Sequence, residues 1–179
     1  MMKRKIGLKG MKWLKIIHLV LVVLMLGGIV SSVAIRLGVH PESYEETVLV
    51  YRVLQTVSDQ IIRYGGFGIL LIGLVYSIWT NWGFFKHKWI LVKWIVFIAQ
   101  TVFGIQFIDR WMVENLSLLE TEKAAALSNP VFLHNETLIR YGAMTQTGLL
   151  LFLIAISVFK PWRKKSDSGV REKAARRSA

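Results

Sequence analysis

The chain has 179 residues, of which 54% are hydrophobic, and its 23 Lys and Arg residues outnumber 11 Asp and Glu residues. This length corresponds to one domain. A soluble basic protein is usually more polar, so the composition favours a membrane protein, and we expect no nucleic-acid partner. Cysteine is absent from the sequence, which excludes disulfides and thiolate metal sites.

Four apolar runs account for the hydrophobic content. A helix rises 1.5 Å per residue, so about 20 apolar residues are needed to cross a hydrocarbon core about 30 Å thick. The predicted transmembrane helices cover about residues 12–36, 59–80, 88–110 and 136–160. We therefore expect an all-α fold, an integral membrane four-helix bundle in residues 1–160. The basic, highly charged residues 161–179 predict a disordered cytoplasmic tail.

The first apolar run follows six Lys or Arg residues and no acidic residue. A basic start, an apolar run and the small residues Ser32–Ala34 together resemble a signal peptide. The run is longer than the apolar core of a signal peptide, and a later segment repeats it. We therefore expect the first helix to remain in the mature protein.

The connection between the first two apolar runs contains a helix start signal. Residues Ser43–Glu46 form a capping box, and apolar residues then recur at helical spacing from Val48 to Val57. This pattern indicates an amphipathic outer helix, which either lies at the membrane interface or extends the second transmembrane helix. A short outer helix is also expected before Asn129 and Pro130, which end it.

Two pairs of similar segments suggest an internal repeat. The stretch DQIIRYGG (59–66) recurs as ETLIRYGA (136–143), 77 residues later. The stretch KWLKIIHLVLVVLMLGGI (12–29) aligns with KWILVKWIVFIAQTVFGI (88–105) at an offset of 76 residues. Both matches occur at nearly one offset, which predicts duplication of a two-helix hairpin. Two helices per copy give the copies the same orientation, as in parallel-repeat transporters.

The shorter repeated motif places an acidic residue four positions before an arginine in each copy, as Asp59 with Arg63 and Glu136 with Arg140. Residues four apart lie on one helical face, so an ion pair is predicted in each copy. Two interpretations are open. The motif is either a structural clamp at the outer helix ends, or it lines an outward pocket for an anionic or quinone-like ligand.

Polar residues also interrupt the third and fourth apolar runs. Gln106 and Gln146 lie at similar depth in the outer half of the membrane, among several threonines and Gln100. Buried amides in lipid need partners, so they either join helices or form the polar wall of a ligand cavity. The candidate ligand-pocket residues are Arg63, Arg140, Gln106, Gln146, Tyr64 and Tyr141.

Histidine is the residue type that points to a cofactor. His18 is the only histidine well inside an apolar run, and His87 lies in the inner turn at similar depth. Two imidazoles on neighbouring helices suit a b-type haem or a copper ion, and His18 is the candidate metal ligand. The alternative is a packing histidine that is hydrogen-bonded to a neighbouring helix.

The distribution of charge predicts the topology. The N-terminal segment, the connection after the second run and the C-terminal tail together hold 17 of the 23 basic residues. Nine of the 11 acidic residues lie in the two remaining connections and their flanks. The positive-inside rule then predicts a multi-pass protein of the bacterial cytoplasmic membrane with both termini in the cytoplasm.

The stretch KWLKIIHLVLVVLMLGGIVSS resembles the first helix of a bacterial membrane superfamily that includes the copper-resistance D domain and small four-helix proteins of unknown function. GFFKHKWILVK is similar to a segment of the latter proteins. The resemblance covers about residues 12–160. It implies a four-helix bundle and a metal- or haem-linked role through His18.

Two functional classes follow from these features. The chain is either a metal- or haem-linked redox or transport protein that uses His18, or a non-catalytic scaffold or subunit of a larger membrane complex. Its expected partners are the lipid bilayer and a membrane protein or a second copy of the chain. An enzymatic activity is not predicted.

Overall fold

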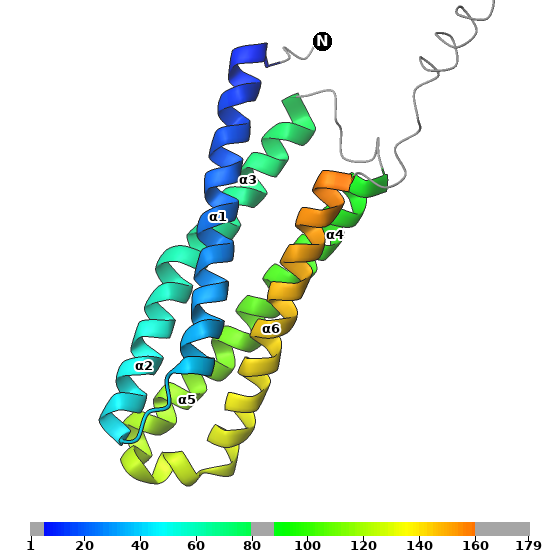
Figure 1. The fold of residues 1–179 in the computed structure, drawn as a ribbon. Helices are drawn as coiled ribbons and strands as arrows, with labels where there is room; N and C mark the ends of the chain where they lie inside the picture. The colour runs from blue at the N-terminus through cyan, green and yellow to red at the C-terminus, as the bar shows by residue number, and fades with distance from the viewer. Residues whose placement is uncertain (1–5, 80–87, 160–179) are drawn as a thin grey trace, which may run out of the picture.

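The computed structural model describes residues 6–79 and 88–159, which form four long helices and no strand (Figure 1). The first long helix is α1 (Leu8–Gly38). The second joins α2 (Tyr44–Val57), the π-helical turn η1 (Ser58–Ile62) and α3 (Arg63–Trp79). The third joins α4 (Lys88–Phe103), the π-helical turn η2 (Gly104–Ile108) and α5 (Asp109–Glu122). A 3₁₀ turn, η3 (Lys123–Ser128), leads to the fourth long helix, α6 (Pro130–Phe159).

The described part of the chain is therefore all-α, as predicted, and each of its four long helices is long and apolar enough to cross a membrane. The helices are longer than the sequence pattern indicated. The 31 residues of α1 span about 45 Å, against a hydrocarbon core of about 30 Å. The predicted amphipathic segment continues directly into the second long helix. This was one of the two alternatives that the sequence left open. The tail and His87 lie outside the described residues.

Local hydrogen bonds set the start of α2 and of α6. Ser43 Oγ accepts from the backbone N–H of Glu46 at 3.2 Å, and the Glu46 carboxylate accepts from the backbone N–H of Glu42 at 2.8 Å. The Ser43 half of the predicted capping box is therefore present, whereas the Glu46 carboxylate binds the N–H of the residue before the N-cap. At the other turn, Asn129 Oδ1 accepts from the Val131 N–H at 2.9 Å, and proline occupies the first position of α6.

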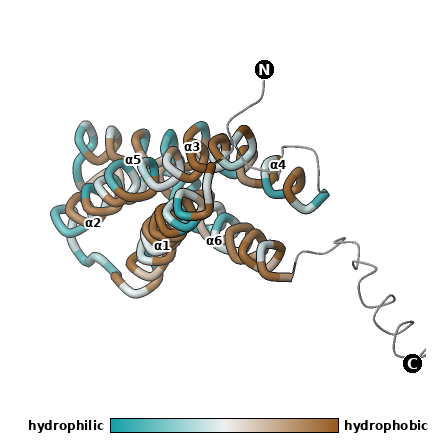
Figure 2. The backbone as a smooth tube through the Cα atoms, turned by 90° about the horizontal axis from the view of Figure 1, so that it is seen from above, coloured by the Kyte–Doolittle hydropathy of each residue, from teal (hydrophilic) through white to brown (hydrophobic). Residues whose placement is uncertain are grey.

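The helices gather into a head at one end and separate into two pairs at the other. In the head, α2, α5 and η3 pack with the end of α1 and the start of α6 (Figure 1). Towards the opposite end, α3 packs on α1 and α4 packs on α6, and α1 also contacts α6. Figure 2 shows that hydrophobic residues predominate along α1 and α6, whereas hydrophilic residues are frequent in α2 and α5.

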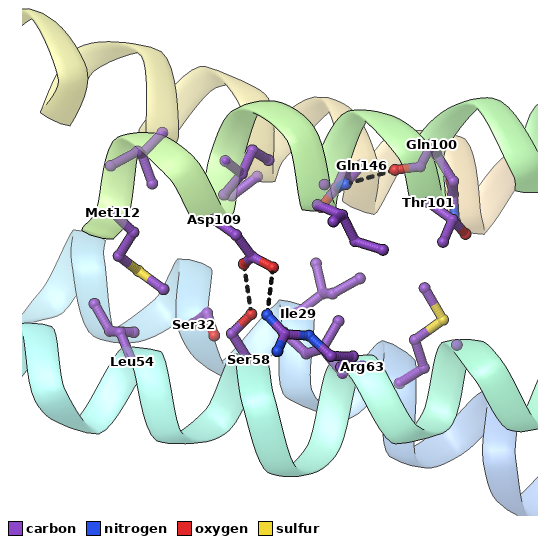
Figure 3. A pocket seen from close by; sticks show the side chains of 18 of the residues that line it. Ile29, Ser32, Leu54, Ser58, Arg63, Gln100, Thr101, Asp109, Met112 and Gln146 are labelled. Carbon is purple, nitrogen blue, oxygen red and sulfur yellow. Dashed lines mark hydrogen bonds and ion pairs between the residues drawn. The ribbon is translucent and has the colours of Figure 1, made fainter. Parts of the chain in front are cut away.

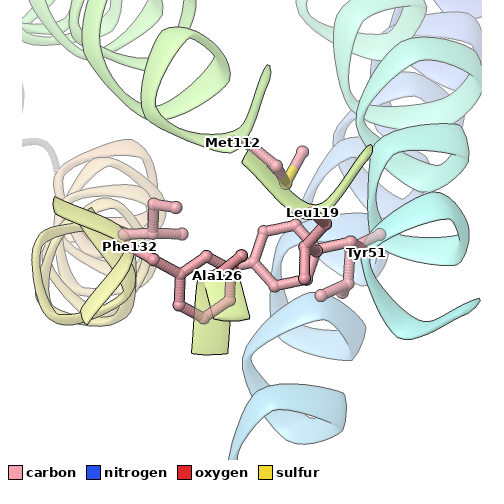
Figure 4. Packing of buried hydrophobic residues seen from close by; sticks show 7 residues of the cluster. Tyr51, Met112, Leu119, Ala126 and Phe132 are labelled. Carbon is pink, nitrogen blue, oxygen red and sulfur yellow. The ribbon is translucent and has the colours of Figure 1, made fainter. Parts of the chain in front are cut away.

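Two hydrophobic clusters fill this arrangement. The head cluster (Figure 4) consists of Tyr51, Leu54, Met112, Leu119, Ala126, Phe132 and Ile139. The span cluster consists of Met25, Ile29, Ile69, Phe97, Leu150 and Leu153. In the most apolar stretches of the four helices, only 11% to 28% of residues are buried. Most of the apolar surface of these stretches therefore faces away from the protein.

Small residues of the repeated motif bring helices close together. A Cβ on Gly65 would lie 3.0 Å from the Met25 Cβ and 3.2 Å from the Met25 backbone nitrogen, so α3 approaches the backbone of α1. A Cβ on Gly142 would lie 3.0 Å from the Ile108 Cδ1 atom, so α6 approaches η2. The contact of Gly65 with backbone atoms requires a residue without a side chain, whereas at Gly142 the neighbouring atom is the end of the Ile108 side chain.

Candidate functional site

An ion pair between buried Arg36 and partly buried Glu136 lies in the head. Arg36 Nη1 donates to both carboxylate oxygens of Glu136, at 3.0 and 3.1 Å. The Tyr51 hydroxyl donates to the same carboxylate, and the guanidinium carbon lies 5.4 Å from the centre of the Tyr51 ring. Arg36 Nη2 also contacts the Met112 sulfur at 3.3 Å. These contacts connect α1, α2, α5 and α6.

Two buried asparagines extend this network. Asn115 is fully buried, and its Nδ2 donates to the Tyr51 hydroxyl at 2.8 Å and to the Phe132 carbonyl at 3.1 Å. Its Oδ1 accepts from Asn135 Nδ2 at 3.0 Å, and Asn135 also donates to Glu114 at 3.1 Å. Because the polar groups of this network are paired within the protein, we interpret the network as structural: it holds the helices of the head together.

A second charge cluster lies where the two π-helical turns meet. Arg63 Nη2 lies 2.9 Å from Asp59 Oδ1. The same nitrogen lies 2.9 Å from Asp109 Oδ2 (Figure 3). The Ser58 hydroxyl donates to Asp109 Oδ1 at 2.8 Å. The predicted pairing of Asp59 with Arg63 is therefore present, and Asp109 is an additional partner from the third long helix. Such π-helical turns inside α-helices are frequent at functional sites.

A cavity of about 80 Å³ lies beside this cluster. Its walls are η1 and α3 on one side and α4 and η2 on the other, with α1 and α6 behind (Figure 3). Arg63 and Asp109 both line the cavity and join its two walls. This volume accommodates a few water molecules, and it is far below the 300–1,000 Å³ of typical cofactor pockets. A haem or quinone ring therefore does not fit inside it.

Gln100 is the deepest polar residue of the cavity lining. Only 2% of its surface is exposed, and among the described residues neither its Nε2 nor its Oε1 has a hydrogen-bond partner. Its backbone carbonyl accepts from Gln146 Nε2 at 3.0 Å. Nine residues separate Gln100 from Asp109, so the amide lies about 13 Å further along the third long helix.

Only some of the residues that were predicted to form a ligand pocket line the cavity. Arg63 and Gln146 line it, whereas Arg140, Gln106, Tyr64 and Tyr141 are exposed and lie outside its lining. Tyr64 and Tyr141 are 67% and 65% exposed, as expected of side chains in an interfacial belt. Glu136 is bound by Arg36 instead of the expected Arg140.

The environment of His18 offers few metal ligands. The imidazole is half-buried, and its ring centroid lies 6.2 Å from that of Tyr76 in an edge-on arrangement. Its Nδ1 is buried and has no hydrogen-bond partner among the described residues. The described ranges contain no group of three or more His, Cys, Asp or Glu residues that could hold a metal ion. These residues therefore do not by themselves form a haem or copper site.

Several residues of the hydrogen-bond network in the head were not predicted from the sequence. For two of them, the asparagines, the sequence pattern does indicate a buried position. Asn115 lies three residues after Met112 and four before Leu119, on the buried face of α5. Asn135 lies three residues after Phe132, on the buried face of α6. An amide in the apolar stripe of an amphipathic helix indicates a buried hydrogen-bonding position.

Most of the side chains that line the cavity are apolar, and the polar groups among them are two amides, hydroxyls and an ion pair, which can form hydrogen bonds to a small ligand. Comparisons of the chain with family models, curated proteins and solved structures gave no match.

Proposed function

We propose that this chain is a multi-pass protein of a bacterial cytoplasmic membrane that binds a small polar solute between its second and third long helices. The observation that carries this proposal is the cavity beside the ion pair of Arg63 and Asp109, with the Gln100 and Gln146 side chains along its walls. Its volume limits the solute to a few non-hydrogen atoms, such as a simple amide.

The distribution of charge supports the proposed orientation. The start of α1, the end of α3, the start of α4 and the end of α6 all lie at the end of the protein that is opposite the head (Figure 1). Lys9, Lys12, Lys15, Lys88 and Lys93 lie in the described helices towards that end. The other 12 of the 17 basic residues counted above precede, connect or follow these helix ends in the sequence. With that end in the cytoplasm, the head and the mouth of the cavity face the outer side.

Glycine contacts support the proposed duplication of a hairpin. Gly28 and Gly104 are equivalent at the offset of 76 residues. A Cβ on Gly28 would lie 2.8 Å from the Ile62 Cγ1 atom, in the second long helix. A Cβ on Gly104 would lie 2.8 Å from Gln146 Nε2, in the fourth. In each half, the shared glycine thus contacts the other helix of its own hairpin.

Thermal unfolding of purified protein tests solute binding. Acetamide, urea and formamide are suitable probes, because a ligand that binds only the folded state stabilises it by about 2.7 kcal/mol at 100 times its Kd. We expect at least one probe to raise the Tm of the wild-type protein. Gln146→Leu should abolish this shift, whereas Gln106→Leu should retain it, because Gln106 does not line the cavity. Equal shifts in both variants would contradict the proposal.

A metal- or haem-linked role through His18 is the second candidate. The buried Nδ1 atom of His18, which has no hydrogen-bond partner among the described residues, favours it, because this nitrogen is available to bind a metal or to form a hydrogen bond. A further ligand would have to come from outside the described residues, where His87 lies. If neither a solute nor a cofactor binds, the scaffold or subunit role is the one that stands.

A further inference from the structure

We propose that a phospholipid with an ethanolamine headgroup docks along the seam between the second and third long helices, where it covers the mouth of the cavity. The seam is the line along which η1 and α3 face α4 and η2 (Figure 3). This proposal rests on the proposed insertion of the helices into a membrane, but it does not depend on solute binding inside the cavity.

The mouth of the cavity lies on this seam. Most of the side chains that line the cavity are buried or half-buried, and the exposed ones are Arg63, Phe67 and Ile105. Phe67 is 51% exposed and Ile105 is 39% exposed, and they belong to the two facing helices. Lining residues on α1 and α6, such as Met25 and Ala143, are buried. The cavity therefore opens sideways between the second and third long helices.

Two contacts between these helices bound the mouth. At the end nearer the head, Arg63 binds Asp109 at 2.9 Å. Towards the opposite end, a Cβ on Gly73 would lie 3.1 Å from the Trp94 Cζ2 atom, so the indole ring packs against α3. The two exposed apolar residues of the mouth lie one helical turn, or about 6 Å, from the first contact, within the apolar runs. A molecule that reaches the mouth at this depth comes from the bilayer.

The size of the cavity decides how a lipid can bind. A volume of about 80 Å³ is too small for an acyl chain, so the chain lies along the seam and only covers the mouth. The exposed Phe67 and Ile105 side chains offer it an apolar surface. The lipid then forms the wall of the cavity that the protein side chains leave open.

The charged cluster at the head end of the mouth suits a headgroup that carries both charges. Arginine has several N–H donors, and the contacts of Arg63 within the described residues use only its Nη2 atom. The Arg63 side chain is 41% exposed, so Nη1 and Nε can donate to a phosphate. Asp59 binds Arg63 through Oδ1 and is 36% exposed, so its Oδ2 atom can accept a hydrogen bond from an ammonium group.

Charge and hydrogen bonding select among the common phospholipid headgroups. The cluster contains two carboxylates, Asp59 and Asp109, and one guanidinium, so its net charge is negative and disfavours an anionic headgroup. A choline headgroup has a quaternary ammonium, which has no N–H to donate to Asp59. Ethanolamine offers a phosphate to Arg63 and N–H donors to Asp59, so it is the headgroup that satisfies both residues.

Native mass spectrometry of the purified full chain in detergent tests the proposal. The protein is incubated with equal amounts of dioleoyl phosphatidylethanolamine and dioleoyl phosphatidylcholine, which differ only in the headgroup. We expect preferential retention of one phosphatidylethanolamine molecule, by about two- to fivefold, as for one partly exposed ion pair. Equal retention of the two lipids, or preference for phosphatidylcholine, would overturn the proposal.

Matched variants assign the lipid to the seam. Asp59→Asn should bring the retention ratio close to one, whereas Glu120→Gln should keep the wild-type ratio, because Glu120 is an exposed carboxylate beside Arg52 in the head. An unchanged ratio in Asp59→Asn would refute the headgroup contact.

A second pair of variants tests the acyl-chain contact. Phe67→Ala should lower the retention of both lipids, whereas Phe152→Ala should not, because Phe152 is 49% exposed but does not line the cavity. Equal retention by these two variants would refute docking at the mouth. If Phe67→Ala does not fold, the Asp59→Asn comparison still decides the proposal. Preferential lipid retention without a Tm shift by the amide probes would refute solute binding alone, and a Tm shift with equal retention would refute lipid docking alone.

Discussion

Arg36 and Glu136 are 100 residues apart in the sequence, yet the Arg36 Nη1 atom lies 3.0 Å from one carboxylate oxygen of Glu136 and 3.1 Å from the other. Their side chains are only 5% and 24% exposed. The pair joins the end of the first long helix to the start of the last. It is therefore a long-range contact that specifies how the two predicted hairpins meet.

Removal of one partner from this pair should destabilise the protein strongly. Glu136→Leu or Arg36→Leu leaves a buried charge without its partner, which typically costs about 3–5 kcal/mol. The double variant should be more stable than either single variant, because no unpaired charge is left. Thermal and denaturant unfolding in detergent measures this. If the losses of unfolding free energy in the two single variants simply added up in the double variant, the two residues would not be coupled. Arg140→Leu, which changes an exposed arginine, serves as the control.

Tyr51→Phe tests the hydrogen bonds of the head. The Tyr51 hydroxyl donates to Glu136 and accepts from Asn115, so its loss leaves a buried amide with one partner fewer. We expect a destabilisation of about 1–3 kcal/mol. Tyr64→Phe removes the same hydroxyl from an exposed ring and should change the free energy of unfolding little. Equal effects of the two substitutions would show that the network contributes nothing.

Gly65→Ala should weaken the contact between α1 and α3. The added methyl group would meet Met25 backbone atoms at 3.2 and 3.3 Å, which cannot rotate away, so the helices must separate. Overpacking of this kind typically costs about 1–3 kcal/mol. Gly148→Ala is the matched control, because nothing lies within 4 Å of the added atom. A Gly65→Ala protein as stable as the control would contradict the close approach.

Reporter fusions test the topology. A periplasm-active reporter fused after Pro41 or Ser128 should give a signal, because both residues lie at the head end of the helices. Fusion after Ala179 should give none, because the C-terminal tail carries eight basic residues from Lys160 onwards. A signal from the Ala179 fusion would contradict the placement of both termini in the cytoplasm.

His18→Asn separates the two roles of the histidine. An amide replaces one hydrogen bond of a packing imidazole, so the variant should insert and fold like the wild type. If His18 binds copper or haem, the wild-type protein should retain the metal or show a Soret band after reconstitution, and the variant should lose it. Colourless, metal-free wild-type protein would exclude the cofactor role.

The sequence predicted local features well, because they depend on neighbours along one helix. Asp59 pairs with Arg63 because residues four apart share a helical face. The same rule predicted a pair of Glu136 with Arg140, but Glu136 turns towards Arg36 on another helix. The packing of distant helices decides which of two available cations a carboxylate meets, and spacing in the sequence does not contain that information.

The directions of the Gln106 and Gln146 side chains show a second limit of prediction from the sequence. Gln106 and Gln146 were both candidate pocket residues, yet Gln146 lines the cavity and Gln106 is exposed. Gln106 lies within the π-helical turn η2, where the helix accommodates an extra residue per turn. Such a turn changes the direction of side chains around the helix axis, and depth along the helix does not contain that direction.

The separation of the two helix pairs away from the head has a mechanical consequence (Figure 1). Rods that are joined firmly at one end act as levers. Over an arm of about 30 Å, a rotation of about 10° at the joint displaces the far ends by about 5 Å, or nearly one helical pitch. A small rearrangement of side chains around Arg36 would thus be amplified into a large movement at the opposite ends of the helices.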